Sequence, residues 1–84
     1  MTGVEIRNVL IEILTNIDPD QDYEHLKDDV SFRDQLSLDS MDSMDIILQL
    51  RQRYRIDIPE KDYSHFETMN STIAYLEPLL ADRH

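Results

Sequence analysis

The chain has 84 residues, a hydrophobic fraction of 40%, and a net charge of −10 that arises from 18 acidic side chains and 8 Lys or Arg side chains. This length leaves room for a single small domain, which we expect to span residues 1–84, and the hydrophobic fraction is too high for a disordered chain. The acidic balance argues against nucleic acid as a partner, because phosphate backbones attract basic proteins, and it favours docking on basic protein surfaces.

No part of the sequence indicates export or membrane insertion. Cysteine is absent, which excludes disulfides and thiolate metal sites. The first ten residues carry Glu5 and Arg7 and lack the apolar core of a signal peptide. No apolar run approaches the ~18 residues of a membrane span. We therefore expect a monomeric, soluble protein of the cytoplasm.

A helix is predicted over residues 3–17. Thr2 and Glu5 have the spacing of a capping box at its start. Asp18-Pro19 should end it, because the residue before a proline avoids helical backbone angles. Its apolar positions recur every three or four residues and form one stripe, which consists of Ile6, Val9, Leu10, Ile13, Leu14 and Ile17.

Residues 18–39 are predicted to form a long connection. The first half is strongly acidic, and the second half contains apolar residues that can anchor it to a core. A short helical turn is expected around residues 31–36. The expected anchors are Val30, Phe32, Leu36 and Leu38.

Three helical segments follow this connection. Residues 40–54 form the clearest second helix, residues 60–66 after Pro59 form one or two turns, and residues 68–77 form a last helix. Thr68 or Asn70 should cap the last helix, and Pro78 should end or kink it. The predicted fold class is therefore all-α: a small bundle of three main helices plus one short helix, with a long loop between the first and second helices.

The stretch LDSMDSMD, residues 38–45, places two serines in nearly identical surroundings. On a helical wheel, Ser43 falls on the stripe that faces the core, and its hydroxyl should bond a carbonyl one turn back. Ser40 lies at the helix start, where its side chain is accessible. The simplest interpretation of Ser40 is an N-cap, since serine is favoured there and Asp42 and Asp45 suit the helix dipole. The other residues of the core-facing stripe are Ile46, Ile47, Leu50 and Tyr54.

A second apolar stripe on the same helix consists of Met41, Met44 and Leu48. A methionine stripe at helical spacing is often part of a core. Exposed apolar residues rimmed by charge would instead favour a docking patch, because methionine adapts to several partners.

The stretch from Phe32 to about Leu76 resembles the acyl carrier protein family. Leu38-Asp39-Ser40-Met41 is similar to the family's Asp-Ser-Leu/Met core, an amphipathic helix follows it, and Ile56-x-Ile58-Pro59 is similar to the family's Ile-x-Ile/Val-Pro ending. The resemblance implies a carrier rather than an enzyme. It also implies that a phosphopantetheinyl transferase attaches 4′-phosphopantetheine covalently to Ser40, with Asp39 assisting through a divalent cation.

The resemblance further implies a docking surface for acyl-transferring or condensing enzymes. Its residues would be Met41, Met44, Asp45 and Leu48. Arg51, which departs from the family, is a further docking candidate because of its charge. The cargo would be an acyl thioester of fatty acid synthesis or of specialised lipid or polyketide synthesis. An aminoacyl or peptidyl carrier is the alternative within the family, and an unmodified helical interaction module is the alternative from another class.

The sequence departs from the family at two places. Ser37 stands where the family usually has glycine, which affects how the transferase fits. Arg51, Arg53 and Arg55 make the end of the second helix basic, where carriers of fatty acid synthesis are typically acidic. These arginines either pair with local acids such as Asp57 or select a dedicated set of partners.

Two other groups of residues carry little chemistry. Asp18, Asp20 and Asp22 resemble the opening of a calcium loop, but Tyr23 replaces the glycine of the sharp turn and Asp29 replaces the final Glu. A solvated acidic loop is therefore expected. The three histidines lack a metal-ligand spacing, and no set of nucleophile, base and orienting group is present. These histidines are His25, His65 and His84.

Overall fold

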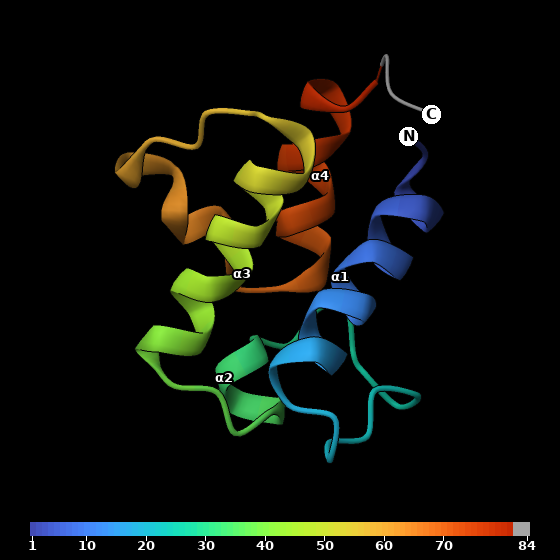
Figure 1. The fold of residues 1–84 in the computed structure, drawn as a ribbon. Helices are drawn as coiled ribbons and strands as arrows, with labels where there is room; N and C mark the ends of the chain where they lie inside the picture. Colours follow the sequence, from blue (N-terminus) through green and yellow to red (C-terminus); the bar gives the residue numbers. More distant parts are fainter. Residues whose placement is uncertain (82–84) are drawn as a thin grey trace.

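A computed structural model describes residues 1–81, which form helices joined by loops (Figure 1). In chain order the helices are α1 (Gly3–Ile17), α2 (Phe32–Gln35), α3 (Ser40–Tyr54), the 3-10 helix η1 (Glu60–Phe66) and α4 (Met69–Leu79). The described part of the chain contains no strand, so the predicted all-α class is confirmed. The turn expected around residues 31–36 is α2, and the turns expected at residues 60–66 are η1. His84 lies outside the described residues.

The capping box predicted for α1 is present. Glu5 N–H donates to Thr2 Oγ1 at 3.2 Å, and Thr2 N–H donates to Glu5 Oε1 at 3.0 Å. At the other end, Asp18 N–H donates to the carbonyl of Leu14 at 2.9 Å, and the chain then leaves the helix before Pro19. Local chemistry therefore sets both ends of this helix.

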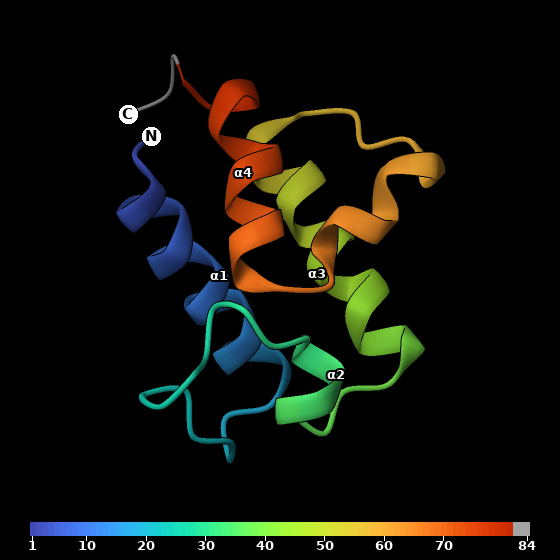
Figure 2. The ribbon, with the colours of Figure 1, turned by 180° about the vertical axis from the view of Figure 1, so that it is seen from behind.

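The core lies where α1 packs against α3 and α4, and both views of the ribbon show α1 and α4 side by side (Figures 1 and 2). Leu50 of α3 is fully buried there, as are Ile13 of α1 and Leu76 of α4. This packing fixes the rotation of α3 about its axis. The stripe with Ile46, Ile47 and Leu50 faces inward, as the sequence predicted, while Tyr54 is only partly buried.

The long connection before α3 is tied to the bundle at several points. The Tyr23 hydroxyl lies 2.9 Å from the carbonyl of Leu14 and 2.6 Å from that of Asp18, so it is held at the end of α1. Arg7 forms an ion pair with Asp28 at 3.2 Å, and the Asp28 carbonyl accepts from Asn70 N–H at 3.0 Å. The connection is therefore an ordered part of the fold, which positions α2 next to the start of α3.

The last helix differs from its prediction at its C-terminal end. Thr68 caps α4 by accepting from Ser71 N–H at 3.0 Å, but the helix continues through Pro78 to Leu79. The predicted end of the helix at residue 77 was therefore two residues too early, and Pro78 does not end the helix. A proline this close to the end removes few helical hydrogen bonds, and Leu80 N–H still donates to Leu76 at 2.9 Å while the Leu80 side chain is buried in the core.

None of the helices within residues 1–81 is long and apolar enough to cross a bilayer.

The orientation of α3 predicts a large difference between two leucines two residues apart. Leu50→Ala should lower the free energy of unfolding by about 2–5 kcal/mol, because it leaves a cavity in the core. Leu48→Ala, on the exposed side of the same helix, should cost less than about 1 kcal/mol. Urea unfolding measures both values, and similar costs for the two variants would show that the helix is rotated differently.

Candidate functional site

The start of α3 is capped by Asp39 and not by Ser40. Asp39 has an extended backbone, and its Oδ1 accepts from Asp42 N–H at 2.9 Å. In return, Asp42 Oδ2 accepts from Asp39 N–H at 3.3 Å, which completes a capping box. The N-cap interpretation of Ser40 was therefore wrong, because the preceding carboxylate already satisfies the backbone N–H group that a serine would have bonded.

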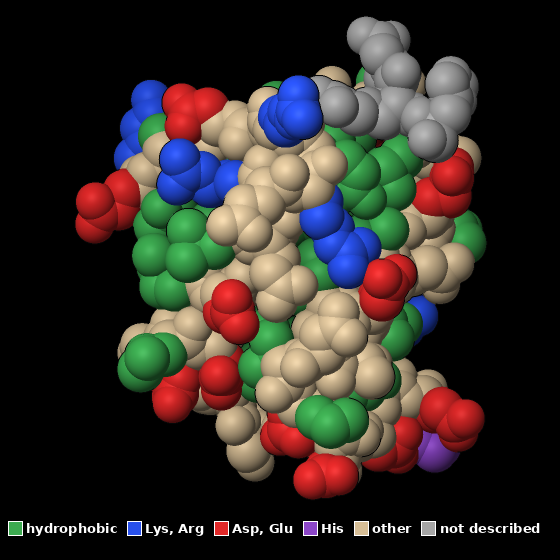
Figure 3. Space-filling view, in the orientation of Figure 1, with side chains coloured by type: hydrophobic (Ala, Val, Ile, Leu, Met, Phe, Trp, Pro, Cys, Tyr) green, Lys and Arg blue, Asp and Glu red, His purple; other side chains and the backbone are tan. Residues whose placement is uncertain are grey.

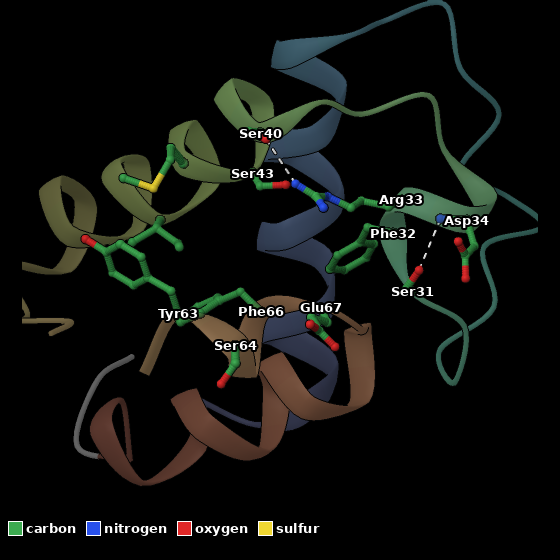
Figure 4. Close-up of a pocket in the computed structure, with 12 residues that line it drawn as sticks. Ser31, Phe32, Arg33, Asp34, Ser40, Ser43, Tyr63, Ser64, Phe66 and Glu67 are labelled. Atoms are coloured by element: carbon green, nitrogen blue, oxygen red, sulfur yellow. Dashed lines mark hydrogen bonds between the residues drawn. The ribbon is translucent and has the colours of Figure 1, made fainter. Parts of the chain in front are cut away.

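Ser40 is consequently the first residue of α3, and its side chain is exposed. Its Oγ accepts a hydrogen bond from Nη2 of Arg33, on α2, at 3.1 Å (Figure 4). Serine oxygen can accept while its own O–H group stays available, so this contact does not occupy the hydroxyl proton. The side chain is held by a rigid helix and is accessible from outside.

Ser43 differs in its surroundings from its twin. Its side chain is partly buried, and its hydroxyl donates to the Asp39 carbonyl at 3.3 Å, one turn back, as predicted. This back-bond and the partial burial leave Ser43 less available than Ser40. The two serines therefore differ because of the helix phase, although their sequence neighbours are nearly the same.

Both serines lie on the rim of a groove between α2, the first half of α3 and η1 (Figure 4). The groove has a volume of about 630 Å³. Its α2 end is polar, with the Arg33 side chain extending toward Ser40, and its other end is mainly apolar. The apolar lining consists of Phe32, Met44, Ile47, Tyr63 and Phe66.

The wall of the groove that η1 provides is fixed by aromatic packing. The Phe66 ring packs edge-on against Tyr75 of α4, with ring centroids 5.4 Å apart. The Tyr75 hydroxyl donates to Asp62 Oδ2 at 2.8 Å, and burial together with this bond raises the pKa of Tyr75 to about 12. This hydrogen bond and the ring contact together join η1 to α4.

The second apolar stripe of α3 is exposed and does not belong to the core. The exposed fractions are 80% for Met41, 40% for Met44 and 42% for Leu48. Asp45, next to them, is also exposed. In Figure 3, hydrophobic and acidic side chains lie together at the lower left, where α3 begins, whereas most of the visible Lys and Arg side chains lie in the upper half.

The three arginines at the end of α3 have different surroundings. Arg53 pairs with Glu12 of α1 at 2.9 Å, which is not a local acid. Arg51 lies 4.0 Å from Asp57, a loose and exposed pair that contributes little to stability. Arg55 is exposed and adopts left-handed backbone angles, with φ of 53°, where it ends the helix. Arg51 and Arg55 thus leave basic surface at this end.

The acidic connection uses its carboxylates in local turns. Asp18 Oδ1 accepts from Asp20 N–H at 3.1 Å, and Asp22 lies 2.8 Å from Nδ1 of His25. The hydrogen bond from His25 lowers the pKa of Asp22. Within residues 1–81, no group of three or more His, Cys, Asp or Glu side chains is arranged to hold a metal ion.

Arg33 is the site residue that the sequence analysis missed. No periodicity marks it, and it is separated from Ser40 by the end of α2 and a loop. Only the return of the chain after α2 brings its guanidinium to the start of α3 (Figure 4).

Comparison with known proteins gives one family and many relatives. A family model described as "Phosphopantetheine attachment site" matches residues 5–76. The chain is similar to a protein named acyl carrier protein from Bdellovibrio bacteriovorus, with 27% identity over 73 residues that cover 87% of each chain. A protein of the same name from Chlorobium luteolum is 29% identical over 79 residues, which cover 90% of this chain and 96% of the relative. A meromycolate extension acyl carrier protein from Mycobacterium tuberculosis is 30% identical over 70 residues, which cover 83% of this chain and 57% of the relative.

The cap assignment predicts that Asp39→Ala lowers the free energy of unfolding by about 1 kcal/mol, because it removes the side-chain acceptor of Asp42 N–H. Asp39→Asn should retain most of the stability, since an amide oxygen also caps. Ser40→Ala should cost less than about 0.5 kcal/mol. Urea unfolding of the three variants tests this, and a larger loss for Ser40→Ala than for Asp39→Ala would overturn the assignment.

Proposed function

The chain belongs to the acyl carrier protein family, and on this premise we propose that Ser40 is the residue to which the 4′-phosphopantetheine arm is attached. The resemblance seen in the sequence is confirmed by the family match. Members of the family are carriers rather than enzymes, and their cofactor is covalently bound 4′-phosphopantetheine.

The observation that carries the proposal is the difference between the two serines. Ser40 is exposed at the first position of α3, and Asp39 performs the capping for which Ser40 would otherwise be needed. Ser43 is partly buried and donates its hydroxyl to a carbonyl. In attachment, Ser40 Oγ forms a phosphodiester with the pantetheine phosphate of coenzyme A, the bond from that phosphate to the adenosine bisphosphate breaks, and the hydroxyl proton passes to a base of the transferase.

The arm supplies a terminal thiol that holds an acyl group as a thioester. The protein provides a rigid attachment point on α3 and surfaces for docking. Tethering makes delivery to a docked enzyme effectively intramolecular, at local concentrations of order mM. We propose acyl intermediates of fatty acid synthesis, or of specialised lipid or polyketide synthesis, as the cargo. The names of the relatives favour an acyl cargo over an aminoacyl one.

The proposed partners are a phosphopantetheinyl transferase and acyl-transferring or condensing enzymes. Exposure supports Met41, Met44, Asp45 and Leu48 as the docking surface, with Arg51 at its basic end. Apolar side chains beside acidic ones suit a partner whose docking face is apolar and basic. We propose that Asp39, beside the attachment point, also assists the transferase. The monomeric state and the cytoplasmic location remain predictions.

Incubation with coenzyme A, magnesium and a broad-specificity phosphopantetheinyl transferase should increase the intact mass by one arm. The increase should persist in Ser43→Ala and disappear in Ser40→Ala, because only the exposed serine reaches the transferase. Mass spectrometry of the three proteins measures the result. A gain that is lost only in Ser43→Ala would refute the assignment of Ser40.

Two controls refine this experiment. Asp39→Asn keeps the helix cap but removes the carboxylate, so slower modification of this folded variant would assign Asp39 a role in the transferase reaction. An unmodified wild-type chain, tested with both a broad-specificity and a cognate transferase, would favour the interaction module that is never modified.

Docking through the methionine stripe predicts that Met41→Gln lowers the kcat/KM of the transferase reaction by about fivefold to tenfold, because the partner loses apolar contact. Val4→Gln is a matched control: Val4 is 71% exposed and is the second residue of α1, as Met41 is of α3. The control should react like the wild type. Equal rates for Met41→Gln and wild type would remove Met41 from the docking surface.

A further inference from the structure

Arg33 is placed where it can act on whatever is attached to Ser40. It is an exposed residue of α2, and its guanidinium reaches across the rim of the groove to donate to Ser40 Oγ at 3.1 Å (Figure 4). A guanidinium carries five N–H donors, so one bond to a hydroxyl uses only part of its capacity. Within residues 1–81, the remaining donors take part in no other hydrogen bond or ion pair that the structure shows.

The charge of Arg33 has no acidic partner within residues 1–81. Three other arginines of this part form ion pairs with carboxylates, namely Arg7 with Asp28, Arg51 with Asp57 and Arg53 with Glu12. For Arg33 the hydrogen bond to Ser40 is the contact that the structure shows. Its positive charge is therefore available to an anion that becomes attached at this serine.

A phosphodiester on Ser40 would be placed among negative charges. Asp39 and Asp42, which form the capping box, are the residue before Ser40 and the second residue after it. Negative charges repel each other, so a cation beside an added phosphate would offset the repulsion from these carboxylates. Arg33 is the cation that contacts the oxygen to which the phosphate would be joined.

We propose that Arg33 binds the phosphodiester of the arm on Ser40 through charge-assisted hydrogen bonds; this inference rests on the proposed function. Arginine suits phosphate, because its planar fork matches two oxygens. Arg33 is a positioning residue: it holds the base of the arm at the polar end of the groove that Met44 and Ile47 also line, whereas Met41 lies outside this lining.

The inference is tested by a double-mutant cycle in which one change is Arg33→Gln and the other is conversion of the apo protein to the holo protein. Urea unfolding gives the free energy of unfolding of the four proteins, which are the apo and holo forms of the wild type and of Arg33→Gln. Urea is the suitable denaturant because it is uncharged and does not screen charges. Attachment of the arm should favour the folded state more in the wild type than in Arg33→Gln, by roughly twofold to fivefold in the unfolding equilibrium constant. The difference should shrink in 1 M salt, where the Debye length is about 3 Å.

Arg55→Gln provides the matched control, because it removes the same charge at the opposite end of α3. It should show no coupling to the arm. Arg33→Lys should restore part of the coupling, since it keeps the charge but lacks the fork. The ³¹P resonance of the holo protein should shift in Arg33→Gln and stay in place in Arg55→Gln.

The outcomes separate this inference from the proposed function. If Ser40 is modified normally and neither Arg33→Gln nor Arg55→Gln shows coupling to the arm, the proposed role of Arg33 is overturned. The assignment of Ser40 as the attachment site is then unaffected. Equal destabilisation of apo and holo protein by Arg33→Gln would also overturn it, because Arg33 would then have only a structural role. Absence of modification at Ser40 would overturn both.

Discussion

The capping box between Asp39 and Asp42 is the interaction on which the candidate site depends. A helix start leaves backbone N–H groups without partners, and some side chain has to accept from them. Because the carboxylate of Asp39 does so here, the next residue, Ser40, begins the helix without its side chain being needed as a cap. Ser40 is thus free of a capping role because Asp39 caps the helix, and both facts follow from the same local arrangement. A serine in the cap position itself would have its oxygen engaged by the backbone.

The packing of α3 decides which face of the helix stays outside. Ile46, Ile47 and Leu50 are buried against the other helices, and this burial fixes the rotation of the whole helix. Met41 and Met44 then lie on the surface near the proposed attachment point. A small domain has little apolar surface to spare for its core, so a stripe of exposed apolar side chains on a well-packed helix favours a binding role.

The charges around the site are unevenly distributed in a way that suits a carrier. The start of α3 is acidic and apolar and is the surface proposed for docking, while Arg51 and Arg55 give its end the opposite sign. Arg33 stands apart from both ends, because it lies on a different helix and contacts Ser40 itself. The two proposals together describe a surface that attracts partners and, beside it, a cation that offsets the charge of a phosphate.

The sequence by itself determined the helices, the family and the accessible serine, because each depends on local or periodic patterns. The capping box of α1, the inward stripe of α3 and the distinction between Ser40 and Ser43 follow from residues within a few turns of one another. The cap by Asp39 is local as well, because Asp39 and Asp42 have the i,i+3 spacing of a capping box, although the sequence prediction assigned the cap to Ser40. Only the tertiary structure decided that the methionine stripe is exposed and that Arg33 reaches Ser40. A pattern in one helix does not reveal which of two apolar stripes another helix covers, and a contact across a loop depends on how the chain returns. The continuation of α4 past Pro78 has the same origin, since burial of Leu80 against the core stabilises a last turn that local preference alone disfavours.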